Sequence, residues 1–319
     1  MESHNTLNTE NIHSSYPGTN LDLREFIFIL WGGKWVIGGL TLLASIASLV
    51  IALNLPDVYR AEALLAPASS EESGGLGGLA SQYGGLASLA GVNLGGLSGG
   101  ADKTALGIEV LRSRKFLGQF IKRHNLLIPL MAAKNWELST KKLILDTDIY
   151  DENKKIWVRV VSLPKQAEPS ILEASEMLSS IMVVVQDSDT GFVKIIVEHY
   201  SPYIAKQWVD WIVEDINREI RDQDATEARN SIAYLKAQLE LTSLAELQAI
   251  FYELIEEQTK TIMLANARSE YLFRTVDPAV VSEEKYGPNR MNYLLLGVFL
   301  GFFSGVFVVL IKNLLASEK

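Results

Sequence analysis

The chain has 319 residues, of which 48% are hydrophobic, and it carries a formal net charge of −9 and no cysteine. This length accommodates one sizeable folded domain together with membrane segments. The negative charge and the lack of a dense basic cluster exclude nucleic acid as a partner, and the lack of cysteine excludes disulfides and thiolate metal sites.

The N-terminal residues, 1–30, are predicted to form a cytoplasmic tail, because residues 1–20 are polar and show no apolar periodicity. A first membrane helix is predicted at 31–55, where residues 36–55 form an uncharged run about as long as a bilayer is thick. Its apolar core lies too far from the start for a cleaved signal peptide. Ala44, Ser48 and Ala52 recur every fourth residue and form a stripe that a second helix can approach closely.

Residues 56–200 are predicted to form a membrane-proximal α/β region. Residues 58–65 alternate between apolar and charged side chains, which is typical of a half-buried strand. Within this region, residues 73–100 are rich in glycine and leucine but have no glycine-lysine signature of a phosphate loop. A flexible linker and a loop that contacts the membrane or another subunit remain equally good readings of that segment.

The rest of the α/β region alternates between helix and strand patterns. Residues 105–124 predict one or two helices, and the Val- and Ile-rich runs 156–161 and 193–197 predict strands. Pro169 opens a predicted helix between these strands. Its apolar residues step by three and four, and they are Ile171, Ala174, Leu178, Ile181 and Val185.

A long helical hairpin is predicted at 201–267. Ser201 and Pro202 are a helix start signal, and no breaker follows until about residue 241, so the first helix spans about 57 Å. Its middle, residues 218–229, is almost wholly charged or polar and is predicted to be solvated. Ser243 and Glu246 match a capping box that starts the returning helix. Residues 268–290 then supply a strand at 273–276 and a linker.

The second membrane helix is predicted at 291–312, followed by a short cytoplasmic tail at 313–319. Residues 293–311 carry no charge, and Gly297, Gly301 and Gly305 lie on one face, where another helix can pack. Two spans place both termini on one side of the membrane, for which we favour the cytoplasm. The predicted fold is therefore an α+β domain, a small α/β layer plus a long helical hairpin, anchored by two transmembrane helices.

Two aspartate pairs are the strongest candidates for catalysis. Residues 146–148 and 187–189 both read Asp-x-Asp, a pattern that holds a metal-bound sugar nucleotide in many glycosyltransferases. Such short matches arise often by chance, and both lie in turn-like positions where aspartate is common. The four histidines have no partner at metal-ligand spacing. We therefore expect no catalytic residue, no cofactor and no metal.

The charged middle of the long helix has two readings. A solvated helix face is the simpler one, and contact with a neighbouring subunit is the other. On the second reading Arg221 and Arg229 face the neighbour, together with the seam residues Leu235 and Leu239.

The order and spacing of several segments resemble the Wzz family of chain-length determinants, the class 1 polysaccharide co-polymerases of Gram-negative bacteria. The resemblance covers nearly the whole chain after the tail, although the proline-rich stretch usual before the second span is reduced here to Pro278 and Pro288. It rests on Asp22-Leu23, Trp31 and Lys34-Trp35, on residues 106–116, on residues 199–208, on residues 257–264 and on Asp277-Pro278-Ala279.

The resemblance implies a two-pass inner-membrane protein with a large periplasmic domain and no catalytic residues. It also implies a homo-oligomeric ring of about eight subunits, which acts with a Wzy-type polymerase on a lipid-linked polysaccharide. The expected function is to set the modal length of O-antigen in lipopolysaccharide. The alternative is a co-polymerase for export of capsule, exopolysaccharide or common antigen that works with a separate tyrosine kinase. A fused kinase is excluded, because the sequence has no Walker motif.

Overall fold

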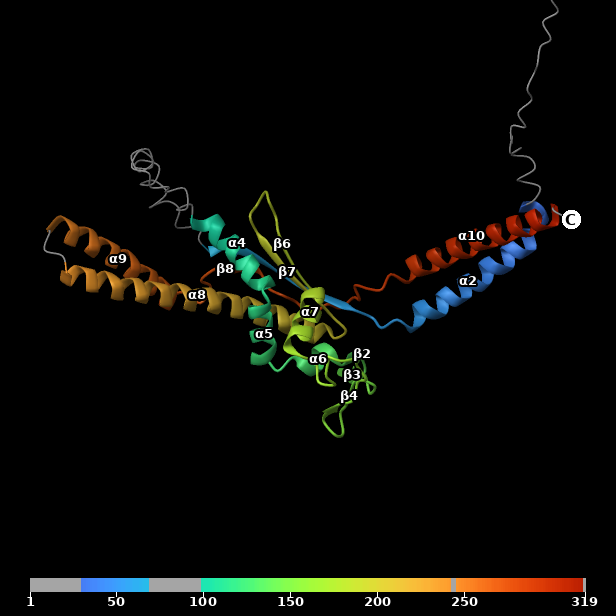
Figure 1. Cartoon of the computed structure of the whole chain (residues 1–319), viewed down its shortest axis with the longest axis horizontal. Helices are drawn as coiled ribbons and strands as arrows, with labels where there is room; N and C mark the ends of the chain where they lie inside the picture. The colour runs from blue at the N-terminus through green and yellow to red at the C-terminus, as the bar shows by residue number, and fades with distance from the viewer. Residues whose placement is uncertain (1–29, 69–98, 242–244, 318–319) are drawn as a thin grey trace, which may run out of the picture. The chain divides into compact units, whose positions relative to one another are not determined.

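The structure, a computed structural model, describes residues 30–68, 99–241 and 245–317. It divides into two units, one made of Met1–Leu55 with Asn289–Lys319 and the other of Pro56–Pro288 (Figure 1). The first holds two long apolar helices, and the second holds strands, short helices and one very long helix. This mixture confirms the predicted fold class. The tail at 1–20, most of the Gly/Leu-rich segment and Ser243 lie outside the described residues.

The two apolar helices are α2 (Lys34–Asn54) and α10 (Arg290–Ser317). Lys34–Asn54 and Arg290–Asn313 are long and apolar enough to cross a membrane, by length and composition. Most of their side chains are exposed, as expected for helices whose outer surface contacts lipid rather than water. The two helices run alongside each other (Figure 1).

A four-stranded antiparallel sheet lies at the centre of the second unit. Its strands are β1 (Tyr59–Pro67), β6 (Met182–Gln186), β7 (Val193–His199) and β8 (Phe273–Asp277), in the order β6-β7-β1-β8. Ala63 pairs with Ile195 in the β1–β7 register. Along β1, buried side chains alternate with more exposed ones, as the sequence pattern predicts. The strands expected near 58–65, 193–197 and 273–276 are thus confirmed.

Two predictions in this unit are wrong. The run 156–161 forms a strand only at β5 (Ile156–Trp157), which pairs with β4 (Tyr150–Asp151) outside the four-stranded sheet. The helix predicted to extend to Val185 is α7 (Ile171–Ile181), and Val185 lies on β6 instead. The β-branched run before Gln186 pairs with β7 along its whole length, and this pairing outweighs the helical spacing.

Short elements complete the α/β unit. These are α4 (Gly99–Arg112), α5 (Arg114–Arg123), α6 (Leu127–Met131), β2 (Ala133–Glu137) and β3 (Lys142–Leu145), the last two forming a hairpin. One core joins α5, α7, the sheet and the start of the long helix, with Trp208, Phe120 and Leu178 among its buried side chains.

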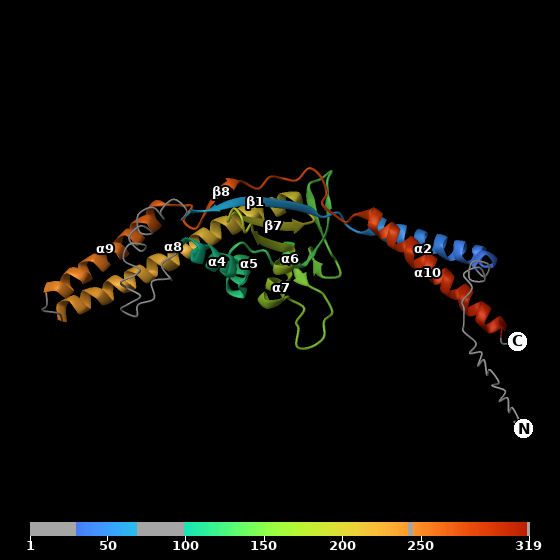
Figure 2. The ribbon, with the colours of Figure 1, turned by 90° about the horizontal axis from the view of Figure 1, so that it is seen from above.

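The long helix α8 (Pro202–Leu241) and the returning α9 (Ala245–Ala267) run side by side (Figure 2). Ser201 accepts a hydrogen bond from the Ile204 amide, as the predicted start requires. With 40 residues, α8 is about 60 Å long. The expectation of a wholly solvated middle is wrong, because Ile220, Ala225 and Ala228 are buried. Tyr271 and Lys103 both contact Asp224 there, which shows that neighbouring segments cover one face of the helix.

Candidate functional site

The first candidate site is the contact between α2 and α10. A Cβ added to Gly301 would lie 2.7 Å from the Thr41 Cα, and one added to Gly305 would lie 2.7 Å from the Ile37 Cα. Gly297 is packed in the same way against Ser48, whose hydroxyl also donates a hydrogen bond to the Tyr293 carbonyl. All three glycines therefore face α2 at a distance that leaves no room for a side chain.

The small residues of α2 lie on the matching face. Ala44 approaches both Gly297 and Gly301, and Ala52 is fully buried. The opposite face of α10 presents large apolar side chains, with Phe299 and Phe303 stacked 6.5 Å apart and both mostly exposed. The helix pair thus has a tight internal seam and a bulky outer surface suited to lipid or to another membrane protein.

Within the α/β unit, the chain segments that lead to α2 and α10 are joined to each other. Val58 and Gly287 form an antiparallel bridge, with the Val58 amide 2.9 Å from the Gly287 carbonyl and the Tyr286 amide 2.8 Å from the Val58 carbonyl. The Arg60 guanidinium lies 3.3 Å from the centre of the Tyr286 ring and pairs with Glu198 at 2.6 Å. This bridge fixes the separation of the two segments.

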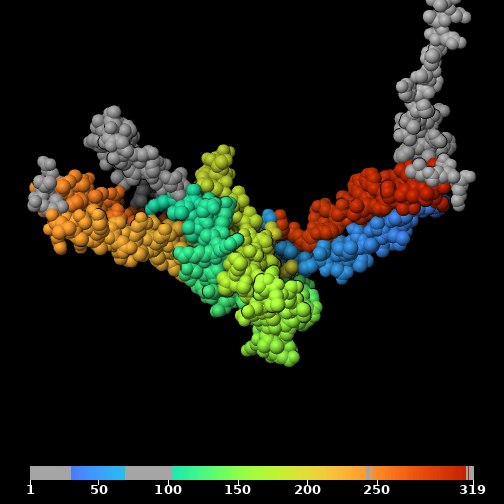
Figure 3. All heavy atoms as spheres, in the orientation of Figure 1, coloured from blue at the N-terminus to red at the C-terminus, as the bar shows by residue number. Residues whose placement is uncertain are grey.

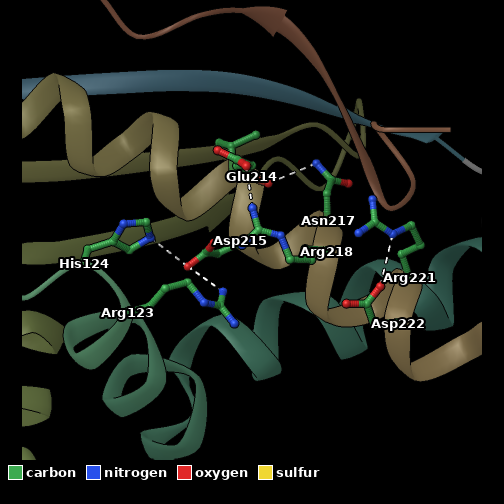
Figure 4. Close-up of polar contacts among 9 residues, drawn as sticks. Arg123, His124, Glu214, Asp215, Asn217, Arg218, Arg221 and Asp222 are labelled. Atoms are coloured by element: carbon green, nitrogen blue, oxygen red, sulfur yellow. Dashed lines mark hydrogen bonds and ion pairs between the residues drawn. The ribbon is translucent and has the colours of Figure 1, made fainter. Parts of the chain in front are cut away.

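A buried carboxylate joins α5 to α8 (Figure 4). Asp215 is only 1% exposed, and its oxygens lie 2.9 Å from an Arg123 nitrogen, 3.0 Å from His124 Nε2 and 3.2 Å from an Arg218 nitrogen. The His124 ring stacks on Trp211, with centroids 4.3 Å apart. Because Arg123 and His124 at the end of α5 both reach this carboxylate on α8, Asp215 holds the end of α5 against the side of α8.

Two residues further along α8, Asn217 fixes the start of β8. The buried Asn217 side chain accepts hydrogen bonds from the Leu272 and Phe273 amides at 2.8 and 2.9 Å, and it donates to the Phe273 and Val213 carbonyls, each at 3.0 Å. One amide side chain therefore satisfies three backbone groups of the returning chain, which would otherwise be buried without partners.

His199 is a third buried polar side chain, at the end of β7. Its Nδ1 accepts a hydrogen bond from the Ser201 amide, so the ring proton lies on Nε2 and is donated to the Pro129 carbonyl, both at 3.0 Å. Burial lowers the pKa of His199, although both of these hydrogen bonds act in the opposite direction. His199 therefore holds α6 against the end of β7 as a neutral ring.

The hairpin carries the residues expected to contact a neighbour. Leu235 lines a shallow depression between α8 and α9 together with Tyr234 and Leu254, and Leu239 is half-buried. Arg221 lies 3.2 Å from the neighbouring Asp222, whereas Arg229 is exposed and has no ion-pair partner within the described ranges. Several large apolar side chains of the hairpin are also exposed, namely Tyr234, Leu241, Leu247, Ile250, Tyr252 and Met263.

Both aspartate pairs lie in turns, as expected. Asp146 accepts a hydrogen bond from the Asp148 amide, which, together with Lys134, lowers the pKa of Asp146. Asp187 accepts from the Thr190 and Asp189 amides, and these bonds lower its pKa. The first aspartate of each pair is thus used to form its own turn. Across the described ranges, no group of three histidine, aspartate or glutamate side chains is placed to hold a metal.

Comparison with known proteins gives one family match. Residues 19–124, about one third of the chain, match the model of the family "Wzz: Chain length determinant protein". The match covers α2, β1, α4 and α5 and includes the run at 106–116, so it confirms the resemblance over this part of the chain. No curated protein matches the chain.

A solved structure described as "full-length bacterial polysaccharide co-polymerase" is similar to this chain over 93% of its length and 99% of the other chain. The two share 13% sequence identity, and the TM-score is 0.38.

Proposed function

We propose that this chain, whose first third carries a Wzz chain length determinant segment, regulates the length of a bacterial polysaccharide and does not catalyse its synthesis. The observation that carries the proposal is the family match over residues 19–124. The use of Asp146 and Asp187 in their own turns supports a role without catalysis, because it leaves these carboxylates poorly placed to bind a sugar nucleotide.

The proposed location is the bacterial inner membrane, crossed twice, with residues 56–288 in the periplasm. Two observations support it. Both apolar helices are long enough to span a bilayer, and their close seam through Gly301 is typical of helices that pair in lipid.

The proposed assembly is a homo-oligomeric ring of about eight subunits. The half-buried Leu235 and Leu239 and the exposed Arg229 make the hairpin the best candidate for contact between subunits. In this arrangement the outer face of α10 contacts a Wzy-type polymerase, and the wall of hairpins limits how long a lipid-linked polysaccharide stays engaged. The polymer we favour is O-antigen.

The experiment that tests the function compares surface lipopolysaccharide, separated by electrophoresis, from cells with and without this chain. We expect a cluster of preferred lengths that becomes a random distribution on deletion and returns when the gene is supplied on a plasmid. A ladder that stays clustered after deletion would exclude O-antigen as the regulated polymer. The same comparison on capsule and common antigen would then test the export-linked alternative.

A further inference from the structure

One loop of the α/β unit exposes aliphatic side chains to an unusual degree. The chain between β5 and α7 stands out from the rest of the unit (Figures 2 and 3), and residues 162–168 are all exposed. Val160 is 99% exposed and Leu163 is 93% exposed. Scattered exposed apolar residues are common. Two almost fully exposed aliphatic side chains on one projecting loop, however, indicate a surface that is covered when the protein functions.

Arg159 makes several of the contacts that hold the loop in place. Arg159 donates to the Ala167 carbonyl at 2.7 Å, to the Gln166 carbonyl at 2.9 Å and to the Glu173 carboxylate at 2.8 Å. Glu173 in turn accepts from the Ser170 amide in the capping box of α7. Both charged side chains of this pair are largely buried, at 15% and 13% exposure. The tip of the loop is therefore held in a fixed position by these contacts.

The loop and the turn before β5 also carry several basic side chains. Residues 151–168 contain four basic residues, Lys154, Lys155, Arg159 and Lys165, and three acidic ones, Asp151, Glu152 and Glu168. Arg159 and Lys165 pair with Glu173, and Lys154 with Asp151. Lys155 is exposed and has no ion-pair partner among the described residues. Aliphatic side chains flanked by lysines are the combination that binds an anionic lipid surface.

The chain path relates the loop to the end of the unit that leads to α2 and α10. The strand β1 starts at Tyr59, soon after the end of α2 at Asn54, and Gly287 shortly precedes the start of α10 at Arg290. Tyr59 pairs with His199, which binds the Pro129 carbonyl of α6. Because α6 packs on α7, the helix that follows the loop lies beside the end of the unit from which both chain segments leave for the apolar helices.

We propose that residues 158–165 dock on the lipid surface of the membrane that α2 and α10 span. Val160 and Leu163 insert among the headgroups, and Lys154 and Lys155 lie against anionic lipid phosphates. This proposal rests on the proposed two-pass topology. A second copy of the chain is a poorer occupant, because two aliphatic side chains on a narrow tip bury far less than the roughly 800 Å² per partner of a stable protein interface.

The lack of cysteine in the natural chain allows a direct test. The full chain with Leu163→Cys carries an environment-sensitive fluorophore and is reconstituted in vesicles of phosphatidylethanolamine and phosphatidylglycerol that contain a headgroup-attached quencher. Leu241→Cys is the matched control, since Leu241 is 80% exposed at the far end of α8. Phe303→Cys, on the exposed face of α10, is read with an acyl-chain quencher and reports the membrane span itself.

We expect quenching at position 163 and none at position 241. Lys155→Glu should weaken the docking equilibrium at least about fivefold, as should phosphatidylcholine in place of the anionic lipid. A label at 163 that remains in water while the label at 303 is quenched would overturn the docking proposal and leave the topology standing. If the labels at both 163 and 303 escape quenching, the two-pass topology is wrong as well. A blue-shifted label at 163 that lipid quenchers do not reach would assign the loop to a neighbouring copy and also overturn the proposal.

Discussion

Gly301 and Thr41 lie so close that a Cβ on the glycine would come within 2.7 Å of the threonine Cα and 2.8 Å of the Ala44 Cβ. Both nearest atoms belong to a helix backbone or to its first side-chain carbon, so neither can move without moving α2. The glycine is therefore required by the geometry of the pair and not by conformational freedom.

Replacing Gly301 by leucine should separate the two apolar helices, at a cost of about 1–3 kcal/mol for overpacking. We expect weaker assembly in native electrophoresis and a broader polysaccharide length distribution. Gly39→Leu is the matched control, because a Cβ at Gly39 meets nothing within 4 Å. Normal assembly and length control in Gly301→Leu would show that the seam has no functional role.

Removing the charge of Asp215 should destabilise the α/β unit. Asp215→Asn leaves Arg123, Arg218 and His124 around a neutral group, and we expect a loss of about 2–3 kcal/mol, below the usual range for a buried pair because both arginines are partly exposed. Urea unfolding of the full chain in detergent, followed by tryptophan fluorescence, measures the change. The exposed Asp222→Asn should stay within about 0.5 kcal/mol of the parent, and an equal effect of both changes would contradict the assigned role.

Asn217→Leu should cost about 3 kcal/mol, because it leaves the Leu272 and Phe273 amides and the Phe273 carbonyl buried without partners. Hydrogen exchange should show the largest loss of protection in β8. The control is Asn230→Leu on the exposed part of the same helix. Unchanged protection in β8 would mean that water molecules replace the hydrogen bonds made by the Asn217 side chain.

Stability should fall as the pH drops below about 6.5, the ordinary pKa of histidine, because the pKa of His199 is lowered in the folded state. In this range the unfolded chain binds a proton that the folded chain does not, and the difference favours unfolding. A second loss follows from Glu173, whose pKa is lowered from 4.5 to about 2, chiefly by Arg159. Its stabilisation is present above pH 4.5 and is lost as the pH falls towards 2. The slope of unfolding free energy between pH 7 and 5 should flatten in His199→Gln, and an unchanged slope there would assign it to other groups.

Alanine at both Arg221 and Arg229 should weaken contact between subunits if the hairpin forms the assembly surface. Exposed ion pairs contribute about 0.2–1 kcal/mol each, and a ring repeats the contact once per subunit, so a change in subunit number measured by mass photometry is the expected result. Lys122→Ala, an exposed change on α5, serves as control. Unaltered ring size and polymer length in the double variant would leave these arginines as a solvated face.

Sequence patterns predicted the elements that depend on local period. The two apolar runs, the strand from Tyr59 and the helix start at Ser201 all follow from side-chain spacing or from a cap, and the structure has each of them. Val185 was assigned to the wrong element, because a spacing of four also suits a helix and only the partner strand decides between the two.

The polar contacts could not be predicted in the same way. His124 and Asp215 are 91 residues apart, and Asn217 and Phe273 are 56 apart, with no local pattern around either pair. The glycine stripe identified Gly301 as a packing residue, but only the structure shows that its partner is α2 of the same chain.

The bridge between Val58 and Gly287 also has a consequence for separating the α/β unit from the two apolar helices. Because the two ends of Pro56–Pro288 meet in their own hydrogen bonds, this unit is an insertion between two helices, and its entry and exit points are neighbours. Units of this kind tolerate excision and transplantation. A gene fragment for residues 56–288 should therefore yield a protein that folds without its anchors, and the anchors joined by a short turn should still pair.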